Sequence, residues 1–216
     1  KAKIIHIDVD GSELRKTVNT VCGLRGDVKL TLGKLLPLLN ERKRPDWMEK
    51  TEAFRKEEEG CLDNRKGLTP RNIILKLNQY LGENTTVCTD VGQHQMLVSQ
   101  YADITENRQL IMSGGLGTMG YGLPGAIGAK IGNPDTPVIS VSGDGGMQMN
   151  IQELATAVLE ELPIICCIFN NEYLGMVRQW QKLFYGKRYA MTNLKAGALS
   201  RRTDGQEYPE YTPDFI

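Results

Sequence analysis

Two short polar segments carry the residues whose types and spacing predict chemistry. Asp144 lies between glycines in the segment 142–146, and Asn171 is the second residue of an Asn-Asn pair. Each segment directly follows an apolar run that is typical of a buried strand. The 27 residues from Asp144 to Asn171 suit one turn, one helix and one returning parallel strand. A right-handed crossover of this length brings both side chains to the same edge of a sheet.

The chemistry predicted at this edge is the binding of a divalent metal ion and a diphosphate. A carboxylate and an amide oxygen suit Mg²⁺, which completes its coordination with phosphates, water and a carbonyl group. Gly145 and Gly146 leave backbone amides open to a diphosphate. Taken singly, Asp144 and Asn171 are also ordinary turn residues. Together with the crossover spacing, they favour a metal and diphosphate site.

A second glycine-rich segment competes for the phosphate. Gly115, Gly117 and Gly120 match the dinucleotide-binding fingerprint, and Asp144 falls where a ribose-binding acid is expected. Further glycines follow, however, and Pro124 interrupts the first turns of the next helix. This excess of glycine indicates a backbone pressed against a flat ligand or another helix. A Rossmann-type dinucleotide site and simple close packing therefore stay open as alternatives.

Alternating strands and helices must position these residues. Strands are predicted at 85–89, 109–112, 137–142 and 164–169, and helices at 70–81, from 93, after the glycine-rich turn and at 151–161. Asn150 is predicted to cap the last helix. This rhythm predicts an α/β fold, a parallel sheet with helices on both faces and ligands at the carboxyl ends of the strands.

The first part of the chain has a different character. A strand at 4–9 and a helix at 28–39 predict that residues 1–40 are a strand-helix remnant of another α/β domain. Residues 41–67 are predicted to be a linker, partly helical, because 16 of the 26 residues at 41–66 are charged. The domain that binds diphosphate and metal then covers 68–216. We expect a fragment of a longer protein, truncated at the C-terminus.

Composition argues against several classes of function for this chain. The 216 residues carry 26 Lys and Arg against 26 Asp and Glu, so charge gives no reason to expect a nucleic acid or an acidic membrane surface as a partner. No apolar run approaches the roughly 20 residues that a membrane span needs. The five cysteines lack Cys-x-x-Cys spacing and are predicted to be reduced. We expect a soluble, cytoplasmic protein.

Further motifs narrow the interpretation. They are Asp-Val-Gly-Gln-His-Gln at 90–95, Gly-Gly-Leu-Gly-Thr-Met-Gly at 114–120, Asn-Ile-Gln-Glu-Leu-Ala-Thr-Ala at 150–157 and Tyr-Leu-Gly-Met-Val-Arg-Gln-Trp at 173–180. Together with the Gly-Asp-Gly and Asn-Asn pair, they resemble the catalytic large subunit of acetohydroxyacid synthase (acetolactate synthase), a family of thiamine-diphosphate enzymes. The pair is specific to the cofactor class, whereas Gly-Met-Val-x-Gln-Trp is more particular to the synthase.

The resemblance implies an activity and a set of site residues. The activity is decarboxylation of pyruvate and carboligation to a second 2-oxo acid, pyruvate or 2-oxobutyrate, in the biosynthesis of valine and isoleucine. The implied Mg²⁺ ligands are Asp144, Asn171 and the main-chain carbonyl of Tyr173. The implied cofactor-binding residues are Gln93, His94, Gly117, Met119, Gly143, Asp144, Gly145, Gly146, Asn171, Tyr173, Gly175 and Met176.

Several of these residues have a structural alternative. Trp180 is implied to form the wall of the pocket that selects the second 2-oxo acid, but its spacing also suits a buried core residue. Met119 and Met176 could be core methionines, and His94 a capping or core histidine. Arg178 is interpreted as a surface charge.

The resemblance also implies partners and a missing part. It implies a homodimer or homotetramer, a small regulatory subunit and FAD in the intact enzyme. No catalytic residue is expected in this chain, because the glutamate that activates the cofactor belongs to a domain outside it, so the chain alone is predicted to be inactive. The alternatives are another thiamine-diphosphate decarboxylase, oxidase or carboligase, and a noncatalytic binding module.

Overall fold

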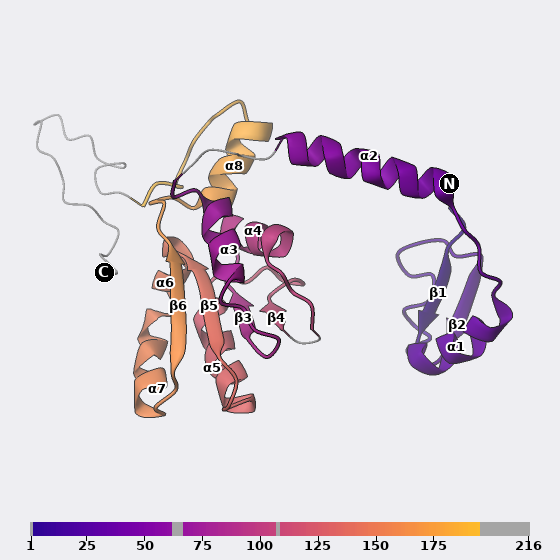
Figure 1. Cartoon of the computed structure of the whole chain (residues 1–216), viewed down its shortest axis with the longest axis horizontal. Coiled ribbons are helices and arrows are strands. Elements are labelled where there is room, and N and C mark those ends of the chain that lie inside the picture. The colour runs from indigo at the N-terminus through magenta and orange to yellow at the C-terminus, as the bar shows by residue number, and fades with distance from the viewer. Residues whose placement is uncertain (1, 62–66, 107–108, 195–216) are drawn as a thin grey trace, which may run out of the picture. The chain divides into compact units, whose positions relative to one another are not determined.

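The computed structural model describes residues 2–61, 67–106 and 109–194, with the side chains at 58–61 outside the description. The chain divides into two compact units, Lys1–Leu62 and Asp63–Ile216. Figure 1 shows the elements of each unit. The predicted diphosphate-binding domain beyond residue 194, and with it the expected C-terminal truncation, lies outside the described residues.

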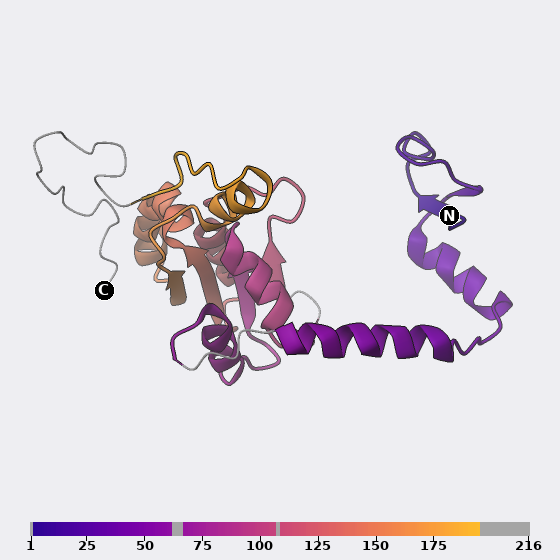
Figure 2. The ribbon, with the colours of Figure 1, turned by 90° about the horizontal axis from the view of Figure 1, so that it is seen from above.

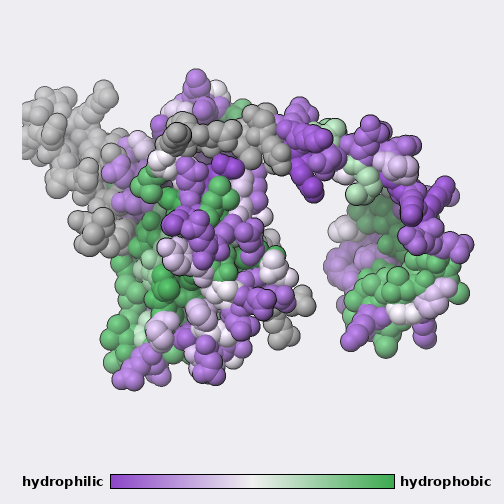
Figure 3. Space-filling view, viewed as in Figure 1, coloured by the Kyte–Doolittle hydropathy of each residue, from purple (hydrophilic) through white to green (hydrophobic). Residues whose placement is uncertain are grey.

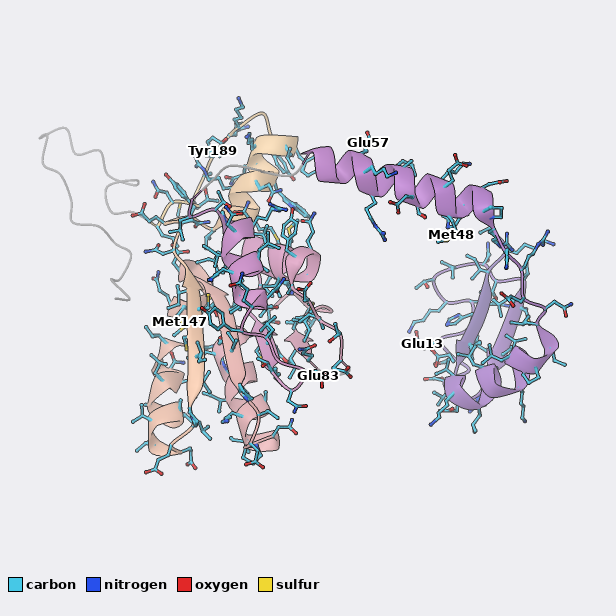
Figure 4. The ribbon with its side chains drawn as sticks, in the orientation of Figure 1. Glu13, Met48, Glu57, Glu83, Met147 and Tyr189 are labelled. Atoms are coloured by element: carbon cyan, nitrogen blue, oxygen red, sulfur yellow. The ribbon has the colours of Figure 1, made fainter. Side chains whose placement is uncertain are left out.

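The first unit contains two parallel strands and two longer helices. Strand β1 (Ile5–Asp8) pairs with β2 (Cys22–Arg25), and α1 (Val28–Leu35) continues as the 3-10 helix η1 (Leu36–Leu38). The sequence predicted β1 and the helix but not β2, whose Cys-Gly-Leu-Arg sequence has no β-branched residue. The charged segment forms α2 (Pro45–Cys61). All of its described side chains are exposed, including those of Met48 and Glu57, labelled in Figure 4.

Over the residues that the structure describes, the second unit is built on a four-stranded parallel sheet in the order β4-β3-β5-β6. The strands are β3 (Thr86–Thr89), β4 (Leu110–Met112), β5 (Val138–Gly143) and β6 (Ile164–Phe169). All three pairings are parallel, which confirms the predicted sheet. Gly143 lies opposite Phe169, so the segments that follow β5 and β6 leave the sheet side by side.

Helices cover both faces of this sheet, as predicted (Figure 2). The helices are α3 (Pro70–Asn78), α4 (Gln93–Tyr101), α5 (Gly122–Gly132), α6 (Asp144–Met149), α7 (Leu154–Leu159) and α8 (Gly175–Phe184), with the 3-10 helix η2 (Ile151–Glu153) before α7. Ile74 of α3 and Val98 of α4 pack with Val87 of β3 on one face. Leu123 of α5 and Met147 of α6 belong to a core cluster on the other face.

The crossover between β5 and β6 differs from the prediction. Asp144 begins a short helix, α6, where a turn was expected. Asn150 occupies the predicted N-cap position, before η2, but its side chain makes no capping hydrogen bond. Its Nδ2 donates instead to the carbonyl oxygen of Gly120 at 2.8 Å. The side chain that local sequence assigned to a helix end therefore also binds the glycine-rich loop before α5.

Apolar side chains are also exposed on the second unit. Val158 and Leu159 of α7 and Ile165 of β6 are exposed, and Figure 3 shows apolar residues over this region. β6 is the outer strand of the described sheet.

Within the described residues, no helix combines the length and apolar character that a membrane span requires.

Candidate functional site

One cavity of about 400 Å³ opens at the carboxyl ends of β3, β5 and β6. This is the edge at which parallel α/β sheets bind ligands. The lining includes all twelve residues predicted to bind the cofactor: Gln93, His94, Gly117, Met119, Gly143, Asp144, Gly145, Gly146, Asn171, Tyr173, Gly175 and Met176. They come from four segments of the chain. The fold thus gathers around one space residues that lie up to 83 positions apart.

Main-chain hydrogen bonds in the loop that follows β6 link Asp144 to the turn that carries Asn171. The main-chain amide of Glu172 donates to Oδ2 of Asp144 at 2.7 Å. The amide of Tyr173 donates to Oδ1 of Asn171 at 2.9 Å. Glu172 has a φ of 61°, in the left-handed region that residues other than glycine rarely occupy. The carboxylate at the end of β5 therefore holds the tight turn that presents Asn171 and Tyr173 to the cavity.

The carboxyl group of Asp144 is in an environment that suits a cation. The residue is only 1% exposed, and burial raises its pKa above the ordinary value. Hydrogen bonds from the amides of Gly145 and Asn171 act in the opposite direction and lower that pKa. A nearby metal ion would stabilise the charged form that burial disfavours.

The donor set fits Mg²⁺ bound together with a phosphate ligand. Among the described residues, no group of three or more His, Cys, Asp and Glu side chains could hold a metal. One carboxylate, one amide oxygen and one main-chain carbonyl are the ligands that this site offers. Mg²⁺ is usually held by one or two carboxylates, with substrate phosphates and water completing the octahedron.

Gly145 allows two leucine side chains to approach the backbone at the edge of the cavity. A Cβ atom at Gly145 would lie 2.8 Å from Cδ2 of Leu174 and 3.3 Å from Cδ1 of Leu194. Gly145 and Gly146 also lie in the first turn of α6, where backbone amides have no main-chain acceptor within the helix. The amides of this first turn are compatible with a bound diphosphate.

His94 presents a buried polar atom without a partner. Its Nε2 has no hydrogen-bond partner among the described residues, although His94 lines the cavity. Its ring lies against Gly92 and Gly143, since a Cβ at either position would come within 3.1 Å of Nδ1. Burial lowers the pKa of His94, which favours the neutral imidazole. A phosphate oxygen is one ligand that would satisfy Nε2 in its protonated tautomer.

Gln93 connects the cavity to α8. Its Nε2 donates to Oε1 of Gln179 at 2.9 Å, and Gly175 lies directly against its side-chain oxygen. The neighbouring methionines, Met119 and Met176, are half-buried and line the cavity rather than the core.

Trp180 does not line this cavity. It lies in a second hollow of about 790 Å³, which shares Met176 and Val177 with the first. Trp180 is 57% exposed, so the alternative of a buried structural residue was wrong. Its ring meets Phe184 edge to face, with 6.0 Å between the centroids.

A segment that the sequence analysis left unassigned, residues 186–194, forms the far side of this hollow. We call it the return segment, because it runs back from α8 to the loop before it; Figure 4 marks its Tyr189 beside α8. Leu174 N donates to Thr192 O at 2.8 Å, and Leu194 N donates to Glu172 O at 2.9 Å. The return segment is thus tied to the same turn that presents Asn171.

Arg178 is not a simple surface charge, contrary to its interpretation from sequence. Its guanidinium lies over the rings of both Tyr173 and Tyr189, and the side chain is half-buried. No local pattern could have indicated the contact with Tyr189. Arg178 is on α8, whereas Tyr189 lies beyond the end of this helix, where the chain has changed direction. Asp90 and Gln179 are further residues whose contacts around the site the sequence analysis missed.

Comparison with known proteins identifies the class of protein that this fold and cavity define. Residues 90–209 match the family model described as the thiamine pyrophosphate enzyme, C-terminal TPP binding domain. This match covers more than half of the chain, which therefore belongs to that family. The family assignment excludes the Rossmann-type alternative and supports thiamine diphosphate as the cofactor.

The curated relatives that the chain matches carry a more specific name than the family model. The chain is 40% identical over 210 residues to the probable acetolactate synthase large subunit of Methanococcus aeolicus, covering 89% of this chain and 35% of the relative. It is 40% identical over 222 residues to the acetolactate synthase large subunit of Corynebacterium glutamicum, covering 100% and 34%. It is 37% identical over 225 residues to the acetolactate synthase isozyme 3 large subunit of Escherichia coli, covering 100% and 36%. The chain spans about a third of the length of these relatives.

Proposed function

We propose that this chain is the cofactor-binding part of an acetolactate synthase large subunit. The enzyme would decarboxylate pyruvate and join the product to a second 2-oxo acid, pyruvate or 2-oxobutyrate, in branched-chain amino-acid biosynthesis. The observation that carries the proposal is the single cavity in which Asp144 is hydrogen-bonded to the turn bearing Asn171 and Tyr173. The similarity to relatives named acetolactate synthase supports this choice within the family.

Each part of the cavity has a distinct role in this proposal. Asp144, the Asn171 side chain and the Tyr173 carbonyl would hold Mg²⁺, and Gly145 with His94 would bind the diphosphate. When bound, thiamine diphosphate supplies the electron sink for decarboxylation of a 2-oxo acid. The remaining residues of the predicted cofactor set, Gln93, Gly117, Met119, Gly143, Gly146, Gly175 and Met176, would orient the cofactor and keep water from it.

Trp180 and the second hollow would select the second substrate. The hollow adjoins the cofactor cavity through Met176 and contains the aromatic rings of Trp180, Tyr185 and Tyr189. Such walls distinguish 2-oxo acids by the size of the apolar side chain. Another thiamine-diphosphate decarboxylase, oxidase or carboligase is the second candidate, and product analysis of the complete enzyme separates the two.

The proposal extends to parts of the enzyme beyond this cavity. Residues 1–40 would belong to the FAD-contacting domain, 41–67 to a linker and 68–216 to the diphosphate-binding domain. The catalytic glutamate would come from another domain. The complete enzyme would be a cytoplasmic homodimer or homotetramer, and the name "large subunit" carried by its relatives supports a smaller regulatory partner.

Calorimetric titration with thiamine diphosphate, with and without Mg²⁺, tests the proposed site. In the complete enzyme we expect Mg²⁺ to be required for tight binding, and Asp144→Ala to weaken that binding by about 10–100-fold. Asp135→Ala is the matched control, because Asp135 is exposed and does not line the cavity. Binding that is independent of Mg²⁺, or equal in the two variants, would refute the metal site.

A further inference from the structure

Asp90, at the end of β3, is a buried carboxylate that does not line the cavity. The residue is 1% exposed, and its own amide continues the sheet by donating to Val141 O at 2.8 Å. None of the ion pairs among the described residues includes it. A buried carboxyl group needs hydrogen-bond partners, and here main-chain amides supply them.

Three amides from two segments converge on this carboxylate. Oδ1 accepts from Val91 N at 2.7 Å and from Gly120 N at 3.0 Å, and Oδ2 accepts from Gly122 N at 2.8 Å. A third segment packs against the same group, since a Cβ at Gly146 would meet the Asp90 carboxylate directly. Gly120 and Gly122 follow Asp90 by 30 and 32 positions, so only the folded structure brings them to its carboxylate.

These three segments are the ones that carry most of the proposed cofactor-binding residues. Val91 leads into Gln93 and His94, Gly120 ends the loop that carries Gly117 and Met119, and Gly146 belongs to the turn that begins with Asp144. We propose that Asp90 is a positioning residue, which holds the three cofactor-binding segments in register without touching the cofactor. This inference rests on the proposed function.

Geometry and charge make opposite predictions for Asp90→Asn. Asparagine has nearly the same shape, but it has one acceptor oxygen and an NH₂ group that would face a main-chain donor. The positioning role therefore predicts weaker cofactor binding. Removing a negative charge from the neighbourhood of an anionic diphosphate would, by charge alone, strengthen binding. The sign of the change thus separates the two explanations.

The experiment compares Asp90→Asn with Val138→Ala in the complete enzyme. Val138 is buried at the opposite end of β5 from the cavity, so its truncation destabilises the fold without touching the site. For Asp90→Asn we expect the thiamine diphosphate concentration for half-maximal activity, at saturating Mg²⁺, to rise about 10–100-fold. The kcat at saturating cofactor should stay near the wild-type value. Val138→Ala should lower the fraction of active enzyme but leave the half-saturating concentration unchanged.

The outcomes separate this inference from the proposed function. If the wild type itself shows no Mg²⁺-dependent binding of thiamine diphosphate, the proposed function fails. If the wild type binds and Asp90→Asn binds equally well or more tightly, the positioning role alone is overturned. Should Asp90→Asn not fold, hydrogen exchange of the wild type decides. Slow exchange of the Gly120 and Gly122 amides before cofactor is added is expected, and rapid exchange overturns the inference.

Discussion

Replacing Arg178 with methionine should loosen the return segment. The guanidinium carbon of Arg178 lies 3.8 Å from the centroid of the Tyr189 ring and 4.5 Å from that of Tyr173. Contacts between a cation and an aromatic ring contribute about 0.5–1 kcal/mol when exposed and about 2 kcal/mol when desolvated. Methionine retains an apolar stem but neither the charge nor the planar group that stacks between the rings.

The expected loss follows from the burial of this side chain. Because Arg178 is half-buried, losing the Tyr189 contact should cost about 1–2 kcal/mol, which raises the opened population about 5–30-fold. The other attachments remain: Leu174 N to Thr192 O, Leu194 N to Glu172 O, and Gln181 Nε2 to Ala190 O at 2.9 Å. The return segment should therefore open more often without detaching.

Limited trypsin digestion measures this opening. Lys187 and Arg188 are exposed cleavage sites within the return segment, and slow cleavage follows the population of the open form. We expect cleavage at these two sites, quantified by mass spectrometry, to be about 5–30-fold faster in Arg178→Met. Lys182→Met is the control, since Lys182 is an exposed cation of the same helix with no ring contact among those described. Equal rates in the two variants would refute the reasoning.

The sheet and its crossover could be predicted from sequence because their signals are local. The strand residues of β5 and β6 form apolar, β-branched runs, and the distance from Asp144 to Asn171 fits one crossover unit. The identity of the cavity residues came instead from motif resemblance. Periodicity gives no information on which side chains meet at the end of a sheet.

The features that sequence analysis missed depend on contacts between distant segments. Two glycines in Asp-Gly-Gly-Met disfavour a helix, yet α6 forms there, and its Gly146 lies directly against the Asp90 carboxylate. Asn150 has the residue type of a helix cap, but its Oδ1 accepts from Gln152 Nε2 at 3.2 Å and its Nδ2 donates to Gly120 O, 30 positions earlier. The apolar spacing around Trp180 correctly indicates one face of a helix, but spacing alone does not say what covers that face.

The remaining predictions concern the cavity, its neighbour and pH. Gly145→Ala should fold but bind thiamine diphosphate at least about tenfold more weakly, because its methyl group would displace the flexible end of Leu174, which lines the cavity. The control Gly128→Ala, in open space on α5, should raise the free energy of unfolding by about 0.5–1 kcal/mol. Calorimetry and urea unfolding measure these effects, and equal cofactor affinity in the two variants would count against the cavity assignment. Trp180→Leu should change the product ratio from mixed pyruvate and 2-oxobutyrate by about tenfold or more, as expected for discrimination of one methylene; an unchanged ratio would remove Trp180 from substrate selection. Acidification should destabilise the fold through His94, since burial lowers its pKa below 6.5. As the pH falls below about 6.5, His94 takes up a proton in the unfolded chain but stays neutral in the folded one. The free energy of unfolding therefore decreases until the pH reaches the folded-state pKa of His94. Urea unfolding of the wild type and His94→Gln at pH 7 and at lower pH isolates this contribution, because the other titrating groups are common to both. A pH dependence as steep in His94→Gln as in the wild type would show that His94 does not cause the acid destabilisation.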